Sequence, residues 1–298
     1  MIVLGIETSC DETSVAVVKN GREVLSNVVF SQIKFHEQYG GVVPEVASRH
    51  HVQKIIYVFE EALTKAGIWP QEIDLVAVTG RPGLIGSLLV GIIAAKAFAI
   101  SHQIEYLEID HLTGHIYANY IEADFEFPVL ALLVSGGHTE LILMKEHYDF
   151  TVLGQTLDDA VGEAYDKVGR VMGLPYPAGI HVDNLAMVNT PSYDLPLVYL
   201  DKNDYNFSFS GLKSAVLNLI NQHKMKDQEV NYPGLAAAFQ ESVVKVLVDK
   251  TIWAAKEYKI KHIVVAGGVA ANKGLRTTMQ RRVQEELGIK LTFPSMKY

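Results

Sequence analysis

The chain has 298 residues, of which 49% are hydrophobic and 20% charged, and its formal net charge is −8. These proportions are typical of a folded globular protein, and they exclude a disordered chain, a collagen-like repeat and a coiled-coil rod. The single cysteine, Cys10, excludes a disulfide framework and a cysteine-built zinc site, and it favours a reducing compartment.

The first half of the chain predicts strands followed by helices. Strands are expected over residues 2–7, 13–18, 23–30 and 74–79, and helices over 44–66 and 84–100. Pro44 suits the first turn of its helix, and the turn Gly80-Arg81-Pro82-Gly83 leads into the last one. That last helix is rich in apolar residues, so we expect it to be buried on most sides.

The pattern begins again near residue 127. Strands are expected over 128–134, 139–144, 150–154 and 263–266, helices over 158–172, 181–188, 210–222, 233–258 and 272–287, and a loop over 190–206. Because the order strand, turn, strand, strand, helices occurs twice, we predict two α/β lobes that face each other across a cleft. The lobes would comprise residues 1–126 and 127–298, the second with a helical insertion at about 157–258.

Neither the N-terminus nor the longest apolar run of the chain indicates a membrane segment. The N-terminus has no basic segment and reaches Glu7 at once, which is unlike a signal peptide. The longest apolar run, 84–100, is interrupted by Lys96 and is shorter than the roughly 20 residues of a membrane span. We therefore expect a cytoplasmic protein that does not cross a membrane.

Charge is distributed unevenly along the chain. Residues 1–150 carry 9 basic and 19 acidic residues, whereas residues 202–297 carry 15 basic and 8 acidic residues. This C-terminal segment could contact phosphates, although solvated helices would give the same asymmetry. The candidate RNA-binding side chains lie on one predicted helix: Lys273, Arg276, Arg281 and Arg282.

Glycine-rich or polar turns follow three predicted strands. They are Thr8–Glu12, Ser135-Gly136-Gly137-His138-Thr139 and Gly267-Gly268. Such turns let backbone N–H groups approach an anion, so together they favour a nucleotide site, although each alone is also an ordinary turn. None has the spacing of a P-loop or of a Rossmann fingerprint.

Two histidines, His111 and His115, are spaced to share one face of a helix. That spacing suits a single metal ion with a further ligand from elsewhere, although two surface histidines would look the same. A zinc protease of this type has Glu after the first histidine, where this chain has Leu112. A metalloprotease therefore remains an alternative that lacks its general base.

Several strings follow one another along the chain in a characteristic order: GIETSCDETS (5–14), YGGVVPEVASRHH (39–51), PGLIGSLLVG (82–91), DHLTGHIYA (110–118), LVSGGHTEL (133–141), GEAYDKVGR (162–170), FSFSGLKSA (207–215) and VVAGGVAAN (264–272). In sequence and order they resemble the TsaD family of tRNA threonylcarbamoyl transferases, which belongs to the actin/hexokinase/Hsp70-like superfamily. The resemblance implies an α/β fold of duplicated, ribonuclease H-like lobes.

The resemblance also implies a reaction and its residues. The family transfers a threonylcarbamoyl group from threonylcarbamoyl-adenylate to the exocyclic amine of the adenosine 3′ of the anticodon, in tRNAs that read codons beginning with A. His111 and His115 match its metal ligands, with iron, zinc or magnesium as the divalent ion. The residues that match its adenylate site are Val134, Ser135, Gly136, Gly137, His138, Asp166, Gly179, Asp183 and Asn272.

Partners follow from the same resemblance. Besides tRNA, a bacterial member works with a TsaB-like paralogue and a TsaE-like ATPase, and an archaeal or eukaryotic one with KEOPS subunits. We expect the subunit interface on the helices of the first lobe.

The chain departs from the family pattern at three places. Arg81 and Ala178 stand where the family usually has Gly. Family members also continue beyond the position of Tyr298 through a string whose Asp completes the metal site, so we expect a third protein ligand and a last helix to be missing. On that ground a non-catalytic scaffold remains an alternative, as does a small-molecule kinase of the same superfamily.

For the mechanism we expect direct attack by the adenosine amine without a covalent enzyme intermediate. Cys10 has no evident activating neighbour, and no serine–histidine pair is apparent. Asp11 and Glu12 are the candidate proton acceptors.

Overall fold

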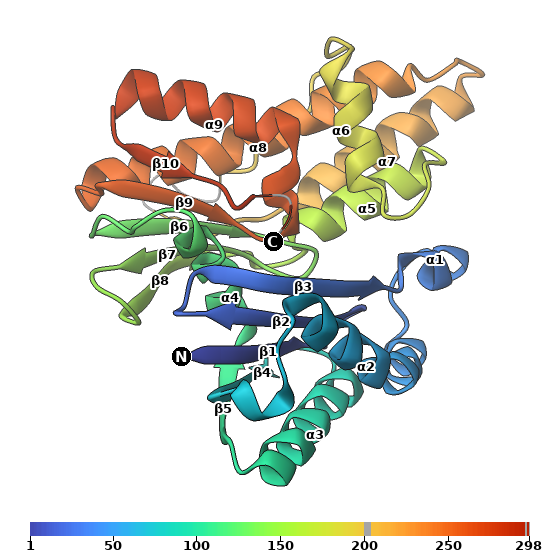
Figure 1. The fold of residues 1–298 in the computed structure, drawn as a ribbon. Helices are drawn as coiled ribbons and strands as arrows, with labels where there is room; N and C mark the ends of the chain where they lie inside the picture. Colours follow the sequence, from blue (N-terminus) through green and yellow to red (C-terminus); the bar gives the residue numbers. More distant parts are fainter. Residues whose placement is uncertain (200–203, 296, 298) are drawn as a thin grey trace. The chain divides into compact units, whose positions relative to one another are not determined.

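The computed structural model describes residues 1–199, 204–295 and 297 of the chain. Contacts divide it into two units, Met1–Glu122 and Ala123–Lys297. Each unit has its own mixed β-sheet and its own hydrophobic core (Figure 1).

The sheet of the first unit has the strand order β3-β2-β1-β4-β5. Its strands are β1 (Ile2–Glu7), β2 (Glu12–Lys19), β3 (Glu23–Ser31), β4 (Leu75–Arg81) and β5 (Glu105–Asp110). β1, β2 and β3 pair antiparallel, whereas β1, β4 and β5 pair parallel. Inward residues such as Leu4, Val15 and Val76 are fully buried, as the alternating pattern predicts.

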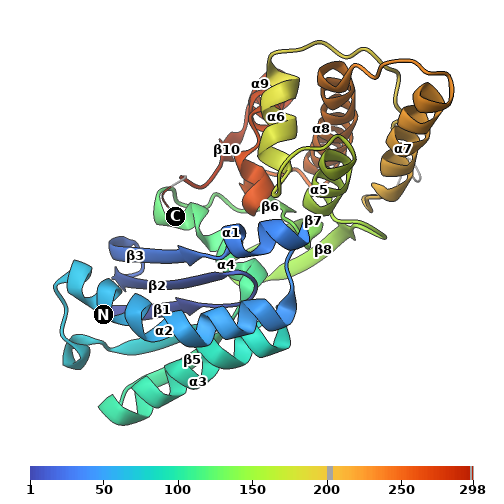
Figure 2. The same ribbon diagram turned by 90° about the vertical axis from the view of Figure 1, so that its right-hand side faces the viewer.

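The helices of the first unit are α1 (Ile33–His36), α2 (Pro44–Ala66), α3 (Ile85–His102) and α4 (His111–Tyr117). α2 begins with Pro44 at its first position and ends at Gly67, whose φ of 66° suits a left-handed cap. α2 and α3 lie side by side, with α2 packed on β2 and β3 and α3 on β4 (Figure 2).

The prediction that the apolar helix α3 is buried on most sides is wrong. Only the face formed by small residues such as Gly91, Ala95 and Ala99 is buried, because small side chains let the helix approach the sheet and α2 closely. Ile85 and Ile93 remain 79% and 63% exposed. Among the described helices, α3 is the one whose length and composition would allow it to cross a membrane.

The sheet of the second unit has the strand order β10-β9-β6-β7-β8. Its strands are β6 (Val129–Val134), β7 (Thr139–Met144), β8 (Phe150–Gln155), β9 (His262–Ala266) and β10 (Lys290–Thr292). β6, β7 and β8 pair antiparallel, and β6, β9 and β10 pair parallel. The predicted duplication is therefore confirmed, since both sheets combine an antiparallel meander with two parallel strands.

The helices of the second unit are α5 (Val161–Val171), α6 (Gly179–Met187), α7 (Ser210–Met225), α8 (Tyr232–Glu257) and α9 (Lys273–Glu286). Asp158 is not part of α5 as predicted, because its carboxylate accepts hydrogen bonds from the N–H groups of Phe209 and Ser210 and so caps α7. The predicted loop is confirmed over 190–199 and 204–206, and residues 200–203 lie outside the described residues.

Sequence patterns missed β5, β10 and α1. β5 has the sequence E-Y-L-E-I-D and lies at the edge of its sheet. Its acidic residues interrupt the apolar pattern by which a strand is recognised. β10 and α1 are shorter than the window over which a hydrophobic period can be recognised.

A buried histidine joins the last two strands of the second sheet. The Glu126 N–H donates to Nδ1 of His262, and Nε2 lies 2.9 Å from Thr292 Oγ1, which fits a neutral ring with a hydrogen on Nε2. Burial, aided by the charge of Lys290, lowers the pKa of His262 from 6.5 to about 4.

This histidine predicts a pH dependence of stability. Because the folded-state pKa lies below the unfolded one, the stabilisation is present above pH 6.5 and is lost as the pH falls toward 4. Between pH 7 and pH 4 the free energy of unfolding should fall by roughly 2–3 kcal/mol more in the wild type than in a His262→Gln variant. Urea titrations at several pH values would measure this difference, and parallel curves would contradict it.

Candidate functional site

The two predicted metal ligands lie together at the end of β5. The Asp110 carboxylate accepts hydrogen bonds from the N–H groups of Leu112 and Thr113, at 2.9 and 3.1 Å, and so starts α4 at His111. His115 follows one turn later, and the two imidazole centroids are 4.4 Å apart at an angle of 73°. The spacing in the sequence therefore brings both rings to one place, as predicted.

A carboxylate that the sequence analysis missed orients the first of these rings. Glu7, the last residue of β1, has Oε2 3.0 Å from His111 Nδ1 and 2.5 Å from Thr79 Oγ1. Burial alone would raise the pKa of Glu7, but hydrogen bonds from His111, Ser9 and Thr79 and the charge of His111 outweigh it and lower the pKa to about 2. An ionised Glu7 only accepts, so His111 donates from Nδ1, which leaves Nε2 as the ring nitrogen that could bind an ion.

This donor set fits a divalent transition metal. A ligating histidine usually donates its other ring N–H to a carboxylate, which is the relation between His111 and Glu7. Within the described residues, no group of three or more His, Cys, Asp or Glu side chains is placed to hold one ion. His111 and His115 could supply two ligands of such an ion.

The turn after Glu7 contains the candidate proton acceptors. Burial and the neighbouring charge of Asp11 raise the pKa of Glu12 to about 7. The same two causes raise the pKa of Cys10, so its thiol stays protonated at neutral pH. This agrees with the expectation that Cys10 is not a nucleophile.

The Ser-Gly-Gly turn of the second unit connects β6 to β7. Val134 is the fully buried last residue of β6, and Ser135 Oγ accepts from the N–H groups of Gly137 and His138 at 3.3 and 3.0 Å. Gly136 and Gly137 are exposed, and a Cβ added to either would meet no atom within 4 Å. The serine side chain thus shapes the turn, and the two glycines leave room beside the backbone.

The second glycine turn of this unit packs against the first. Gly267 follows β9, the parallel neighbour of β6, and has φ 90° and ψ 168°. A Cβ at this position would collide with the backbone oxygen of Val134. Two of the three turns predicted to favour a nucleotide therefore lie side by side at the ends of adjacent strands.

Asp183 and Asn272 belong to one buried hydrogen-bond network. Asp183 accepts from the N–H groups of Lys273 and Gly274 at the start of α9, and Asn272 Oδ1 accepts from Leu275 N at 2.8 Å. Gln240 on α8, which the sequence analysis missed, donates to Asp183 at 2.9 Å and accepts from Asn272 Nδ2 at 2.9 Å. Both side chains, which were predicted to bind the substrate, therefore accept hydrogen bonds from the N-terminus of α9 in this structure.

α5 connects these two groups of residues. Its Gly162 N–H donates to Ser135 O at 3.1 Å, and one turn later Asp166 accepts from Ala178 N at 2.7 Å, which sets the start of α6 at Gly179. The nine predicted substrate residues therefore lie at the end of β6, in the turn after it, on α5 and α6, and at the residue before α9.

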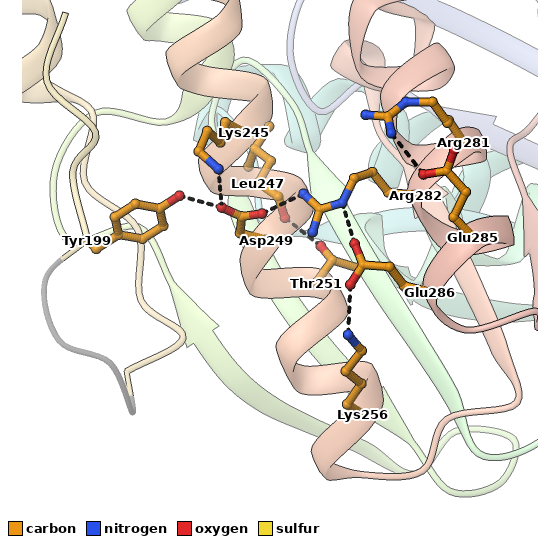
Figure 3. Close-up of polar contacts among 10 residues, drawn as sticks. All are labelled: Tyr199, Lys245, Leu247, Asp249, Thr251, Lys256, Arg281, Arg282, Glu285 and Glu286. Carbon is orange, nitrogen blue, oxygen red and sulfur yellow. Dashed lines mark hydrogen bonds and ion pairs between the residues drawn. The ribbon is translucent and has the colours of Figure 1, made fainter.

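Two of the candidate RNA-binding side chains on α9 also make contacts within the second unit, and Figure 3 shows those of Arg282. Arg282 contacts Asp249 at 2.6 Å and Glu286, and its side chain is only 21% exposed. Arg276 donates to the backbone oxygens of Ala270 and Pro294. Arg282 thereby joins α9 to α8, and Arg276 joins α9 to the segments before it and after β10.

The chain is similar in sequence to one named family. A family model described as TsaD, tRNA N6-adenosine threonylcarbamoyltransferase, matches residues 23–298. A tRNA N6-adenosine threonylcarbamoyltransferase of Geobacillus thermodenitrificans is 56% identical over 294 residues, which cover 99% of this chain and 86% of that protein. The enzyme of the same name from Bacillus subtilis is 55% identical over 296 residues, with the same coverage.

Solved structures of low sequence identity share the fold. Full-length HypF has a TM-score of 0.64 at 14% identity, over 99% of this chain and 52% of that one. Component A of the Acidaminococcus fermentans (R)-2-hydroxyglutaryl-CoA dehydratase has a TM-score of 0.58 at 15% identity, over 98% and 91%. These similarities bear out the predicted actin/hexokinase-like α/β fold.

Proposed function

Since the chain belongs to the TsaD family of tRNA N6-adenosine threonylcarbamoyltransferases, we propose that it transfers a threonylcarbamoyl group from threonylcarbamoyl-adenylate to a tRNA adenosine. The acceptor is the adenosine 3′ of the anticodon in tRNAs that read codons beginning with A. The observation that carries the proposal is the 56% identity over 99% of the chain, a span that contains both histidines and the Ser-Gly-Gly turn.

The exocyclic amine of adenosine is a poor nucleophile because its lone pair is delocalised into the ring. The donor must therefore be activated. In the transfer, the amine nitrogen forms a bond to the carbamoyl carbon, the bond from that carbon to the phosphate oxygen breaks, AMP leaves, and the amine loses a proton. Glu12, whose pKa is raised to about 7, is matched to accept a proton at neutral pH.

The second unit would hold the adenylate. Gly136 and Gly137 offer exposed backbone at the end of β6, where N–H groups can bind phosphate or carboxylate oxygens. Asp166, Gly179, Asp183 and Asn272 would surround the nucleoside.

A divalent ion held by His111 and His115, which we propose to be iron, would supply the chemistry of a Lewis acid. Glu7 supports this role because it fixes the ring of His111 with Nε2 presented. No feature of the described residues favours the metalloprotease alternative. Leu112 stands at the position of the base, and the neighbouring carboxylate of Asp110 caps α4.

A transfer assay tests the proposal. The purified chain, loaded with metal and supplied with carboxyl-labelled threonylcarbamoyl-adenylate and the proposed tRNA, should release AMP and place equal label in the tRNA. A tRNA whose target adenosine is replaced by guanosine is the control and should stay unlabelled. AMP release without labelled tRNA would contradict the proposed acceptor.

The partner that we propose, a TsaB-like paralogue assisted by a TsaE-like ATPase in a bacterial cytoplasm, would bind the exposed face of α2 and α3. This face is formed by Val52, Ile56 and Tyr57 on α2 and by Ile85, Leu89, Ile93 and Ile100 on α3. Large apolar side chains gathered on two adjacent helices are typical of a protein interface.

A double substitution on this face tests the partner. Ile56→Asp with Ile93→Asp should weaken binding of the paralogue by about 100-fold or more, because two apolar contacts are lost and two charges would be buried. Isothermal titration calorimetry measures the affinity, and the melting temperature should stay unchanged since both side chains are exposed. Val188→Asp, at an exposed apolar site in the second unit, is the control. Undiminished binding by the double variant would exclude this face.

A further inference from the structure

His51 lies two turns into α2 and is completely buried, although the proposed reaction does not use it. Its Nε2 is 2.9 Å from the backbone oxygen of Cys10, and its Nδ1 is 2.7 Å from Thr13 Oγ1. A carbonyl oxygen only accepts hydrogen bonds, so Nε2 carries a hydrogen. Burial lowers the pKa of His51 and keeps the ring neutral, so Nδ1 accepts from the Thr13 hydroxyl. One tautomer therefore satisfies both contacts.

The residue that His51 holds is part of the turn that orients His111. Ser9 Oγ and Glu7 Oε2 lie 3.2 and 3.0 Å from His111 Nδ1. The Ser9 N–H also donates to the Glu7 carboxylate. Since Cys10 directly follows Ser9, a displacement of the Cys10 carbonyl would move both groups that contact His111.

Backbone groups hold the rest of this turn. The Gln32 N–H donates to Asp11 O at 3.0 Å, and the Leu84 N–H donates to Ser9 O at 2.8 Å. His51 differs from these two because its donor belongs to a side chain and can be exchanged by substitution. It is also a rigid ring, which gives the Cys10 carbonyl a fixed partner deep in the first unit.

We propose that His51 is a positioning residue for the transfer reaction: its Nε2–H holds the Cys10 carbonyl and thereby keeps Ser9 and Glu7 against His111. This inference rests on the proposed function for its kinetic consequence. His51 itself touches neither substrate nor metal.

Two neutral amides at this position form a matched test. In His51→Gln the amide nitrogen reaches the place of Nε2 and can donate to the Cys10 carbonyl, whereas in His51→Asn the amide ends near Nδ1 and cannot. We expect kcat to fall roughly 10- to 100-fold in His51→Asn with the KM for tRNA unchanged, and to stay near the wild-type value in His51→Gln, because a displacement of about 1 Å is enough for such a loss. Equal losses in both variants, or none in His51→Asn, would overturn the proposal.

A spectroscopic measurement separates this inference from the proposed function. Long-range ¹⁵N–¹H correlation spectra of the unaltered protein should show His51 with a hydrogen on Nε2 and a bare Nδ1. The ring signals of His111 should shift in His51→Asn and not in His51→Gln. If the wild type transfers nothing, the proposed function fails while these signals still decide the positioning role. The positioning role would be refuted by the opposite tautomer of His51, or by His111 ring signals that do not change in His51→Asn. If a variant fails to fold, the tautomer of His51 in the wild type still tests the proposal.

Discussion

Replacing both His111 and His115 by Ala should lower the rate of threonylcarbamoyl transfer by roughly 10³-fold or more. A Lewis acid contributes several kcal/mol to stabilising developing charge, and each 1.4 kcal/mol is a factor of ten in rate. The two rings, 4.4 Å apart, are the ligands that we propose for the metal, so their loss should also remove bound metal from the purified protein. Elemental analysis and the transfer assay measure these two effects on the same sample.

The fold should survive this double substitution. Glu7 keeps its hydrogen bonds from Thr79 Oγ1 and Ser9 N when His111 is lost, and Asp110 still caps α4 through backbone groups. Circular dichroism should therefore match that of the wild type. His102→Ala, which removes another partly exposed histidine from the first unit, is the control and should retain both metal and transfer. Full transfer by a folded, metal-free double variant would refute the role of the metal.

The histidine pair was recognisable from its spacing, but the carboxylate that orients it was not. Glu7 is 104 positions away from His111, and nothing in its local sequence distinguishes it from any acid at the end of a strand. The contact arises because β1 and β5 flank β4 in one parallel arrangement, so that their C-terminal ends meet. A tertiary contact of this kind follows from strand order, which a local pattern does not determine.

The same difference between local and tertiary information explains which parts of the fold could be predicted from the sequence. The helix over 44–66 was predicted with its bounds; Pro44 suits its first turn, and in the structure Gly67 ends it with a left-handed backbone. The exposure of α3 was not predictable from composition, since an apolar helix looks alike whether the sheet covers one face or all of it. Its small residues Gly91, Ala95 and Ala99 were the available signal for the packed face.

In the second unit the resemblance gives the proposed adenylate residues, and the structure shows that two of them are linked by hydrogen bonds. Asp183 and Asn272 both accept from the first N–H groups of α9, and Gln240 bridges them. A nucleoside that binds these side chains must share them with the helix. Substitutions at Asp183 are therefore expected to affect the position of α9 together with ligand binding, which makes them poor probes of the adenylate site.

Gly267 offers a cleaner probe, and Gly267→Ala should weaken binding of a non-hydrolysable threonylcarbamoyl-adenylate analogue by about tenfold or more. Its backbone, at φ 90° and ψ 168°, lies in a region that is almost restricted to glycine, where a side chain costs on the order of 1–3 kcal/mol. The new Cβ would also collide with Val134 O, so the turn would have to move away from the end of β6. Because Ser135 follows Val134 directly, that movement would displace the Ser-Gly-Gly turn from its binding position.

Gly268→Ala is the matched control for this prediction. It adds the same methyl group one residue later, where a Cβ meets no atom within 4 Å and φ is not positive. Calorimetric titration of the analogue should therefore give near wild-type affinity for Gly268→Ala and weak binding for Gly267→Ala, with a melting temperature lowered in the latter alone. If both variants bind equally well, the contact between the two glycine turns does not shape the adenylate site, and the strain at Gly267 serves only the fold of the second unit.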